Sequence, residues 1–145
     1  MTRVFLADAQ AEERSALRLL LNDIKMAVVG EATDWPAALL QAPVSDSDMV
    51  LIDRELLPAE PCQALEELRA SCPRLILIIL LLNYLDFRRQ AELSCVADLF
   101  INKQESPHRI AERLRQAALT VRNQSSKKSY FYRVGRKKTD RTRKS

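Results

Sequence analysis

Three charged residues lie at or just beyond the ends of short apolar runs, and their side chains could act together in chemistry. Asp8 and Asp53 each lie at the end of such a run, and Lys103 comes two residues after another. Carboxylate oxygens bind hard cations such as Mg²⁺, and an ammonium group neutralises a phosphoryl group. The three side chains therefore predict a site for a divalent cation and a phosphate, provided that the fold brings them together. The alternative is that each is a solvated surface charge, as Asp and Lys usually are.

The apolar runs that precede these charges indicate buried strands. They are four to eight residues long and cover residues 3–7, 27–32, 49–53, 75–82 and 98–101. The runs are apolar on both faces rather than strictly alternating, which is typical of parallel strands covered by helices on both sides.

Between the runs, apolar residues recur at helical spacing. Leu17, Leu20, Leu21 and Ile24 follow an i, i+3, i+4, i+7 pattern, and residues 110–121 repeat similarly. Helix starts are indicated at Asp34, Glu60-Pro61, Asp86 and Ser106-Pro107. Five strands alternating with five helices predict an α/β fold, a doubly wound (βα)5 parallel five-stranded sheet of flavodoxin-like type. Ligands of such sheets bind beyond the carboxyl ends of the strands, where Asp8, Asp53 and Lys103 would meet.

Composition excludes several classes of protein. The chain has 145 residues, of which 47% are hydrophobic and 29% charged, as expected for a globular domain. Its two glycines cannot form a Walker loop or a dinucleotide fingerprint. Three cysteines without CxxC spacing and a single histidine argue against a zinc site or a disulfide framework. The longest apolar run has eight residues, so we expect no signal peptide, no spanning helix and a cytoplasmic location.

Charge separates an acidic body from a basic C-terminal tail. Residues 121–145 contain ten Lys or Arg and one acid, for a net charge of +9, whereas residues 1–120 carry −5. We expect the tail, residues 122–145, to be flexible and to offer candidate contacts to nucleic acid or another anion. These candidates are Lys127, Lys128, Arg133, Arg136, Lys137, Lys138, Arg141, Arg143 and Lys144. Three interleaved aromatic residues could stack on unpaired bases. The alternatives are an acidic protein, a membrane surface, or a merely solvated tail.

Three segments resemble the receiver domain of response regulators, the CheY-like family, over roughly residues 2–121. In VFLADAQ, Asp8 resembles an acid of the family's first strand, in MVLIDRELLP Asp53 lies at the phosphoacceptor position, and in INKQESP Lys103 lies at the family's lysine. Ala9 and Asp53 are 44 residues apart, and Asp53 and Lys103 are 50 apart. These intervals resemble those of the branch of the family whose members carry helix-turn-helix output domains. The resemblance implies a receiver-like domain over 1–121, Mg²⁺ held by Asp8 and Asp53, a phosphate contacted by Lys103, and a histidine kinase as partner.

The sequence departs from the family at three site positions. Ala9 stands in place of a second acid, Leu81 in place of Thr or Ser, and Leu82 in place of a small residue. In receivers the hydroxyl moves to bond the phosphoryl group, which an aliphatic side chain cannot do. We therefore expect Mg²⁺ binding and phosphorylation of Asp53 to be weak or absent. A register slipped by two residues would place Asn83 there, but the interval to Lys103 argues against it.

Other positions carry further expectations from the resemblance. Glu55 could reach the metal position left by Ala9, or could be a solvent-facing loop residue. Phe100 resembles the aromatic that turns inward on activation, with plain packing as the alternative. The last two helices and the fifth strand form a face that often dimerises in the family, and a homodimer is a candidate here. That face would include Phe87, Ala91, Phe100, Ala111 and Arg115.

The sequence is thus interpreted as an atypical single-domain receiver, a pseudo-receiver in two-component phosphorelay signalling. It would act through protein contacts and would not be an enzyme. One alternative is a working phosphoacceptor receiver. The other is a nucleic-acid-binding accessory protein that uses the basic tail.

Overall fold

The five predicted strands are present and form one sheet. The computed structural model describes residues 1–83 and 97–124. The strands are β1 (Arg3–Ala7), β2 (Ala27–Ala32), β3 (Met49–Asp53), β4 (Leu77–Leu82) and β5 (Leu99–Asn102). All are parallel, in the order β2-β1-β3-β4-β5. The predicted doubly wound α/β sheet is confirmed, with β4 starting two residues later than the apolar run and β5 shifted by one residue.

Three of the helices begin where the sequence places their starts, at Asp34, Glu60-Pro61 and Ser106-Pro107. They are α1 (Ala11–Asp23), α2 (Trp35–Ser45), α3 (Pro61–Ser71), the short 3₁₀ helix η1 (Arg54–Leu56) and a helix over residues 107–124. The Asp34 carboxylate accepts a hydrogen bond from the backbone N–H of Ala37 at 2.8 Å and caps α2. The Ser106 hydroxyl oxygen accepts one from the backbone N–H of Arg109 at 3.2 Å. The helix expected to begin at Asp86 lies outside the described residues.

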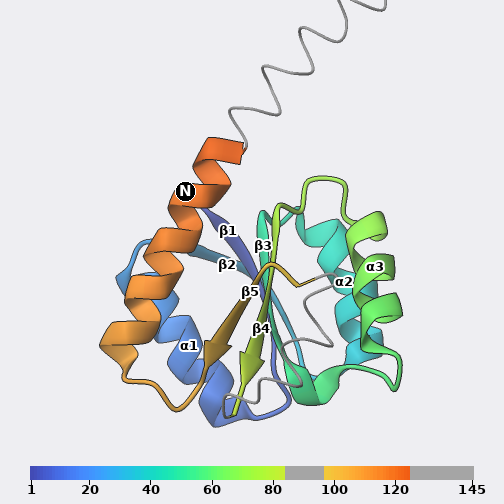
Figure 1. The fold of residues 1–145 in the computed structure, drawn as a ribbon, viewed down its shortest axis with the longest axis horizontal. Helices are drawn as coiled ribbons and strands as arrows, with labels where there is room; N and C mark the ends of the chain where they lie inside the picture. Colours follow the sequence, from blue (N-terminus) through green and yellow to red (C-terminus); the bar gives the residue numbers. More distant parts are fainter. Residues whose placement is uncertain (84–96, 125–145) are drawn as a thin grey trace, which may run out of the picture.

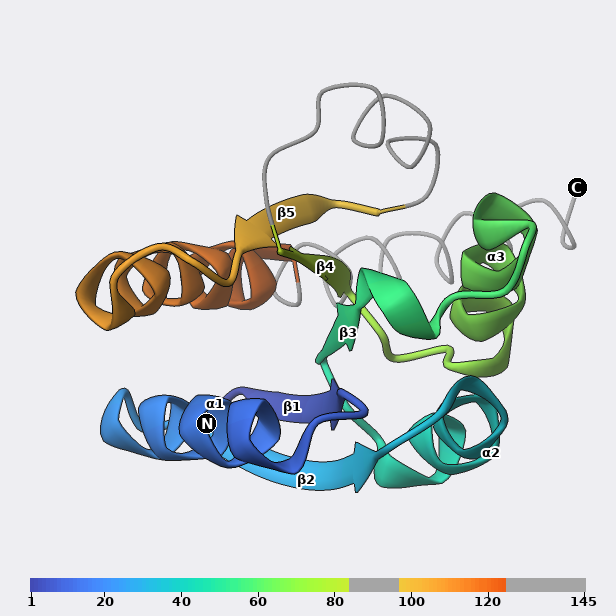
Figure 2. The same cartoon turned by 90° about the horizontal axis from the view of Figure 1, so that it is seen from below.

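Helices cover both faces of the sheet. Figures 1 and 2 show α1 and the helix over 107–124 on one face, and α2 and α3 on the other. Two buried clusters fill the two interfaces. In β1, Val4 and Leu6 pack on the face covered by α1 and the helix over 107–124, while Phe5 and Ala7 pack on the face covered by α2 and α3. Because β1 is buried on both sides, its sequence is a continuous apolar run rather than an alternating one.

One glycine permits a close approach between β2 and β1. A Cβ atom at Gly30 would lie 2.8 Å from two ring carbons of Phe5. The Phe5 side chain is fully buried, so the ring has little room to move away. Gly30 is therefore required by packing.

The chain order reverses at β1, whose neighbours are β2 and β3. In doubly wound sheets this switch point opens a crevice at the carboxyl ends of the strands. Asp8 directly follows β1, and Asp53 is the last residue of β3. Asp53 is in register with Leu81 of β4, and Lys103 follows β5. The fold therefore gathers these residues at one edge of the sheet.

Several sequence expectations concern residues that the structure does not describe. Phe87, Ala91 and the nine basic tail residues lie outside the described part of the chain. Residues 122–124, which the charge pattern assigns to the tail, belong to the last helix. Within the described ranges, no helix combines the length and the hydropathy that a bilayer span requires. Cys62 is disulfide-bonded, so the expectation that the chain contains no disulfide is wrong, whereas Cys72 is buried with a free thiol.

Candidate cation and phosphate site

The carboxyl edge of the sheet brings Lys103 between the two predicted carboxylates. Its Nζ atom lies 2.6 Å from Asp53 Oδ2 and 3.7 Å from Asp8 Oδ2. The backbone N–H of Lys103 donates to the carbonyl oxygen of Leu82 at 2.7 Å, which continues the β4–β5 pairing to the site. The Lys103 side chain is only 9% exposed. The spacing of the three charges in the sequence therefore corresponds to a real cluster.

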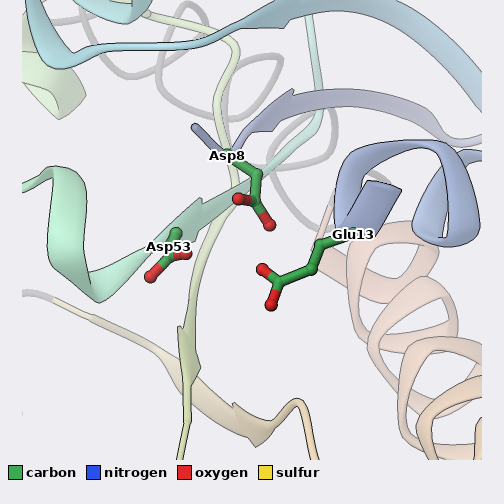
Figure 3. A group of neighbouring side chains, drawn as sticks. All are labelled: Asp8, Glu13 and Asp53. Carbon is green, nitrogen blue, oxygen red and sulfur yellow. The ribbon is translucent and has the colours of Figure 1, made fainter. Parts of the chain in front are cut away.

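The cluster contains a third carboxylate that sequence reasoning missed. Glu13 lies in the first turn of α1, and its Oε2 atom accepts a hydrogen bond from Lys103 Nζ at 2.5 Å. Carboxylate oxygens of Asp8, Glu13 and Asp53 lie within 4.8 Å of one another. Figure 3 shows their side chains converging from β1, α1 and β3. The available signal was the short loop after Asp8, because an acid in the first turn of the next helix stays close to the strand end.

Asp8 is the most deeply buried member of the cluster. Its side chain is fully buried, and Oδ1 accepts a hydrogen bond from the backbone N–H of Gln10 at 2.9 Å. Oδ2 accepts no hydrogen bond from the described residues. Burial, with smaller contributions from the charge of Asp53 and a side-chain hydrogen bond with Glu13, raises the pKa of Asp8 from 3.8 to about 6, although the Gln10 hydrogen bond and the charge of Lys103 both lower it. Ionisation of Asp8 in the folded protein thus costs free energy, and a nearby cation would stabilise the ionised form.

Asp53 is held by a loop and by the lysine. Its Oδ1 atom accepts a hydrogen bond from the backbone N–H of Glu55 at 3.0 Å and so caps η1. Its Oδ2 atom accepts from Lys103. Glu55 itself is exposed, and its carboxylate is not a member of the described cluster of three acids. The suggestion that Glu55 binds metal stays a prediction.

Lys103 remains charged despite its burial. Burial lowers the pKa of this ammonium group, but hydrogen bonds to Asp53 and Glu13 and the charges of Asp53 and Asp8 outweigh that effect. The net result is a pKa raised above the ordinary value of 10.5. The ammonium group therefore serves as the counter-charge of the cluster, and could equally neutralise phosphoryl oxygens.

The positions that depart from the receiver pattern carry apolar side chains, and Leu81 lies beside the site. Ala9 is exposed, Leu81 is fully buried and Leu82 is 2% exposed. Leu81, Glu13 and Lys103 help to line a groove of about 380 Å³. At the end of β4 the site is therefore lined by alkyl groups rather than by a hydroxyl.

The predicted switch residue Phe100 and the predicted interface residues differ in how far they are exposed. Phe100 is half-buried and packs against the cluster beneath α2 and α3. Ala111 is buried by its own chain, so it cannot contribute exposed surface to a dimer face. Arg115 is exposed. Of the three described candidates for that face, only Arg115 is exposed.

The residues present fit a hard divalent cation. Asp8 and Asp53 offer carboxylate oxygens, the donor type that Mg²⁺ prefers. The Asp8 Oδ2 atom is buried and accepts no hydrogen bond within the described part of the chain, so a bound cation would compensate its charge. Asp8 and Asp53 are the predicted ligands, and the structure is compatible with that role.

Comparison with known proteins finds solved structures with a similar fold. No protein-family model and no curated protein matches the sequence. The signal receiver domain of the response regulator NarL from Mycobacterium tuberculosis is 24% identical, with 81% of this chain and 95% of that chain covered and a TM-score of 0.67. The isolated REC domain of RcsB from Salmonella enterica serovar Typhimurium, studied with the phosphomimetic BeF3⁻, is 22% identical, with coverages of 82% and 88% and a TM-score of 0.70.

A more distant relative agrees with these two. The CheY-like response regulator receiver domain protein from Methanospirillum hungatei is 18% identical, with 86% of this chain and 98% of that chain covered and a TM-score of 0.72. The relationship spans nearly the whole length of each of these domains. The sheet order and these similarities agree. The chain has the fold of a response-regulator receiver domain.

Proposed function

We propose that this chain is an atypical receiver module of two-component signalling, with Asp53 at the phosphoacceptor position. The observation that carries the proposal is the contact of 2.6 Å between Lys103 Nζ and Asp53 Oδ2, beside Asp8, at the carboxyl edge of a receiver fold. The partner that this chemistry requires is a phosphodonor, either a histidine kinase or a small phosphorylated molecule. The domain would act through protein contacts and not as an independent enzyme.

The reaction open to Asp53 is phosphoryl transfer. A carboxylate oxygen attacks phosphorus, a new O–P bond forms, and the bond to the donor nitrogen or oxygen breaks with its electron pair leaving on the donor. Lys103 would pair with the phosphoryl oxygens after its present contact with Asp53 loosens. Mg²⁺, when bound by Asp8 and Asp53, would supply further charge neutralisation.

Three features lead us to propose weak phosphorylation and a weak response. Leu81, in register with Asp53, has no hydroxyl to bond a phosphoryl group. Leu82 is almost fully buried, and its side chain is larger than the small residue that stands at this position in receivers. Ala9 also removes one acid from the end of β1, which lowers the affinity for Mg²⁺.

Intact-mass measurement after incubation with acetyl phosphate and Mg²⁺ tests this proposal. We expect little or no addition of a phosphoryl group to the parent chain and none to Asp53→Asn. Complete, Asp53-dependent phosphorylation would instead support the alternative of a working phosphoacceptor. A matched receiver known to accept phosphate serves as the positive control for the donor.

A second candidate function rests on the composition of the basic C-terminal tail. The net charge of +9 over residues 121–145, with three aromatic residues among the cations, favours an accessory role in nucleic-acid binding. In that case the receiver-like body would be a platform for the tail. Binding of the full chain to DNA, RNA and anionic vesicles distinguishes nucleic acid from a membrane surface.

A further inference from the structure

We propose that Glu13 supplies the acid that Ala9 lacks, so that a divalent cation such as Mg²⁺ binds among Asp8, Glu13 and Asp53. The inference deepens the proposed function, and it rests on that function for the choice of Mg²⁺. It assigns the third carboxylate of the site to the first turn of α1 instead of the end of β1.

The Glu13 carboxylate lies close to the carboxylates of the two expected ligands, Asp8 and Asp53. The three carboxylates have oxygens within 4.8 Å of one another, which is close enough to share one cation. Figure 3 shows the Glu13 side chain reaching from α1 toward the gap between Asp8 and Asp53. Ala9, by contrast, is exposed and carries no ligand atom.

A separate observation indicates that the cluster is built to take a ligand. Asp8 Oδ2 is inside the cluster and fully buried, and it accepts no hydrogen bond from the described residues. The ammonium group of Lys103 forms an ion pair with this oxygen, with Nζ 3.7 Å away. A buried carboxylate oxygen without a hydrogen bond is uncommon, and a directly coordinated cation would satisfy it.

Lys103 explains how the cluster persists without a metal ion. Its ammonium group lies 2.5 Å from Glu13 Oε2 and 2.6 Å from Asp53 Oδ2. A cation must therefore displace this ammonium group from Glu13, and its affinity is lower than at three acids with no competing lysine. The cation has a route to the site, because the Glu13 side chain is 33% exposed whereas those of Asp8 and Asp53 are at most 7% exposed.

The test is calorimetric titration of the full chain with Mg²⁺ and, separately, Mn²⁺. Glu13→Gln should raise the dissociation constant by about 10-fold or more. Glu12→Gln, which removes an exposed acid from the same helical turn, is the matched control and should change nothing. Thermal melts of each variant verify that the fold is retained.

Two further variants separate ligation from a general effect of charge. Glu13→Asp keeps the charge but shortens the reach, so it should weaken binding nearly as much as Glu13→Gln. Adding Ala9→Asp to Glu13→Gln should restore the affinity, and the same change in the parent should add less. The proposal is overturned if the parent binds neither ion, if Glu13→Asp binds as the parent does, or if Ala9→Asp strengthens both backgrounds equally.

These outcomes are independent of phosphorylation. A parent chain that binds Mg²⁺ through Glu13 but accepts no phosphoryl group retains this inference. A chain that is phosphorylated equally with Glu13 or Gln at this position, and that binds Mg²⁺ equally, refutes the inference and leaves the receiver function standing.

Discussion

Replacing Asp8 by asparagine measures how strongly this buried acid opposes folding in the absence of metal. Burial raises the pKa of Asp8 from 3.8 to about 6. At about 1.4 kcal/mol for each pH unit, this difference amounts to about 3 kcal/mol. Because the folded-state pKa is the higher one, the stability that protonated Asp8 contributes is fully present below pH 3.8 and is lost as the pH rises through about 6.

The asparagine variant avoids this loss because it never ionises. Its amide oxygen can still accept the hydrogen bond from Gln10, and its NH₂ group can donate to the carboxylates of Glu13 or Asp53. At neutral pH and with a chelator present, Asp8→Asn should therefore be more stable than the parent by about 2 to 3 kcal/mol. At about pH 3 the two proteins should be nearly equal in stability.

Urea denaturation of both proteins, across the range from about pH 3 to pH 8, checks the expectation. Asp23→Asn, which removes an exposed carboxylate at the end of α1, is the control and should show no such gain. A variant that is no more stable than the parent at neutral pH would contradict the reasoning. The reasoning would also be contradicted if the difference in stability between the two proteins did not grow as the pH rises.

Three further changes have defined outcomes. Gly30→Ala should lower the free energy of unfolding by about 1 to 3 kcal/mol, because the new Cβ would overlap the buried Phe5 ring, and thermal or urea unfolding measures this. Leu81→Thr combined with Ala9→Asp should extend the amide shifts caused by beryllofluoride from the site toward β5, and unchanged shifts would show that these two positions do not limit the response. Removing residues 125–145 should abolish any DNA binding, while the full chain should show a slope of roughly −5 in log K against log salt if six cations contact a duplex. Equal binding by both forms would leave the tail without a role.

Most of the fold could be predicted because the central strands β3 and β4 are buried on both faces. The four residues of β3 before Asp53 are all apolar, which is typical of a parallel strand covered by helices on both sides. Asp8, Asp53 and Lys103 could be predicted as a cluster because parallel strands bring their carboxyl ends to one edge.

The role of Glu13 could not be predicted in the same way. Its position depends on the rotation of α1 about its axis, which is fixed by how Leu17 and Leu21 pack beneath the sheet. Ala111 was assigned to an exposed face for a related reason. The helix over 107–124 turns Ile110, Ala111 and Leu114 inward, and only the packed structure defines that orientation.

The ion pairs of Lys103 also bear on the order in which the chain can fold. The contact with Glu13 joins residues 90 apart in sequence, and the contact with Asp53 joins residues 50 apart. Both must wait until β5 docks on the edge of the sheet, and contacts of such long range are slow to form. A partly folded chain without β5 would hold three carboxylates close together with no ammonium group among them. Such an intermediate is penalised by charge repulsion, so the cluster makes folding of the two halves of the sheet more cooperative.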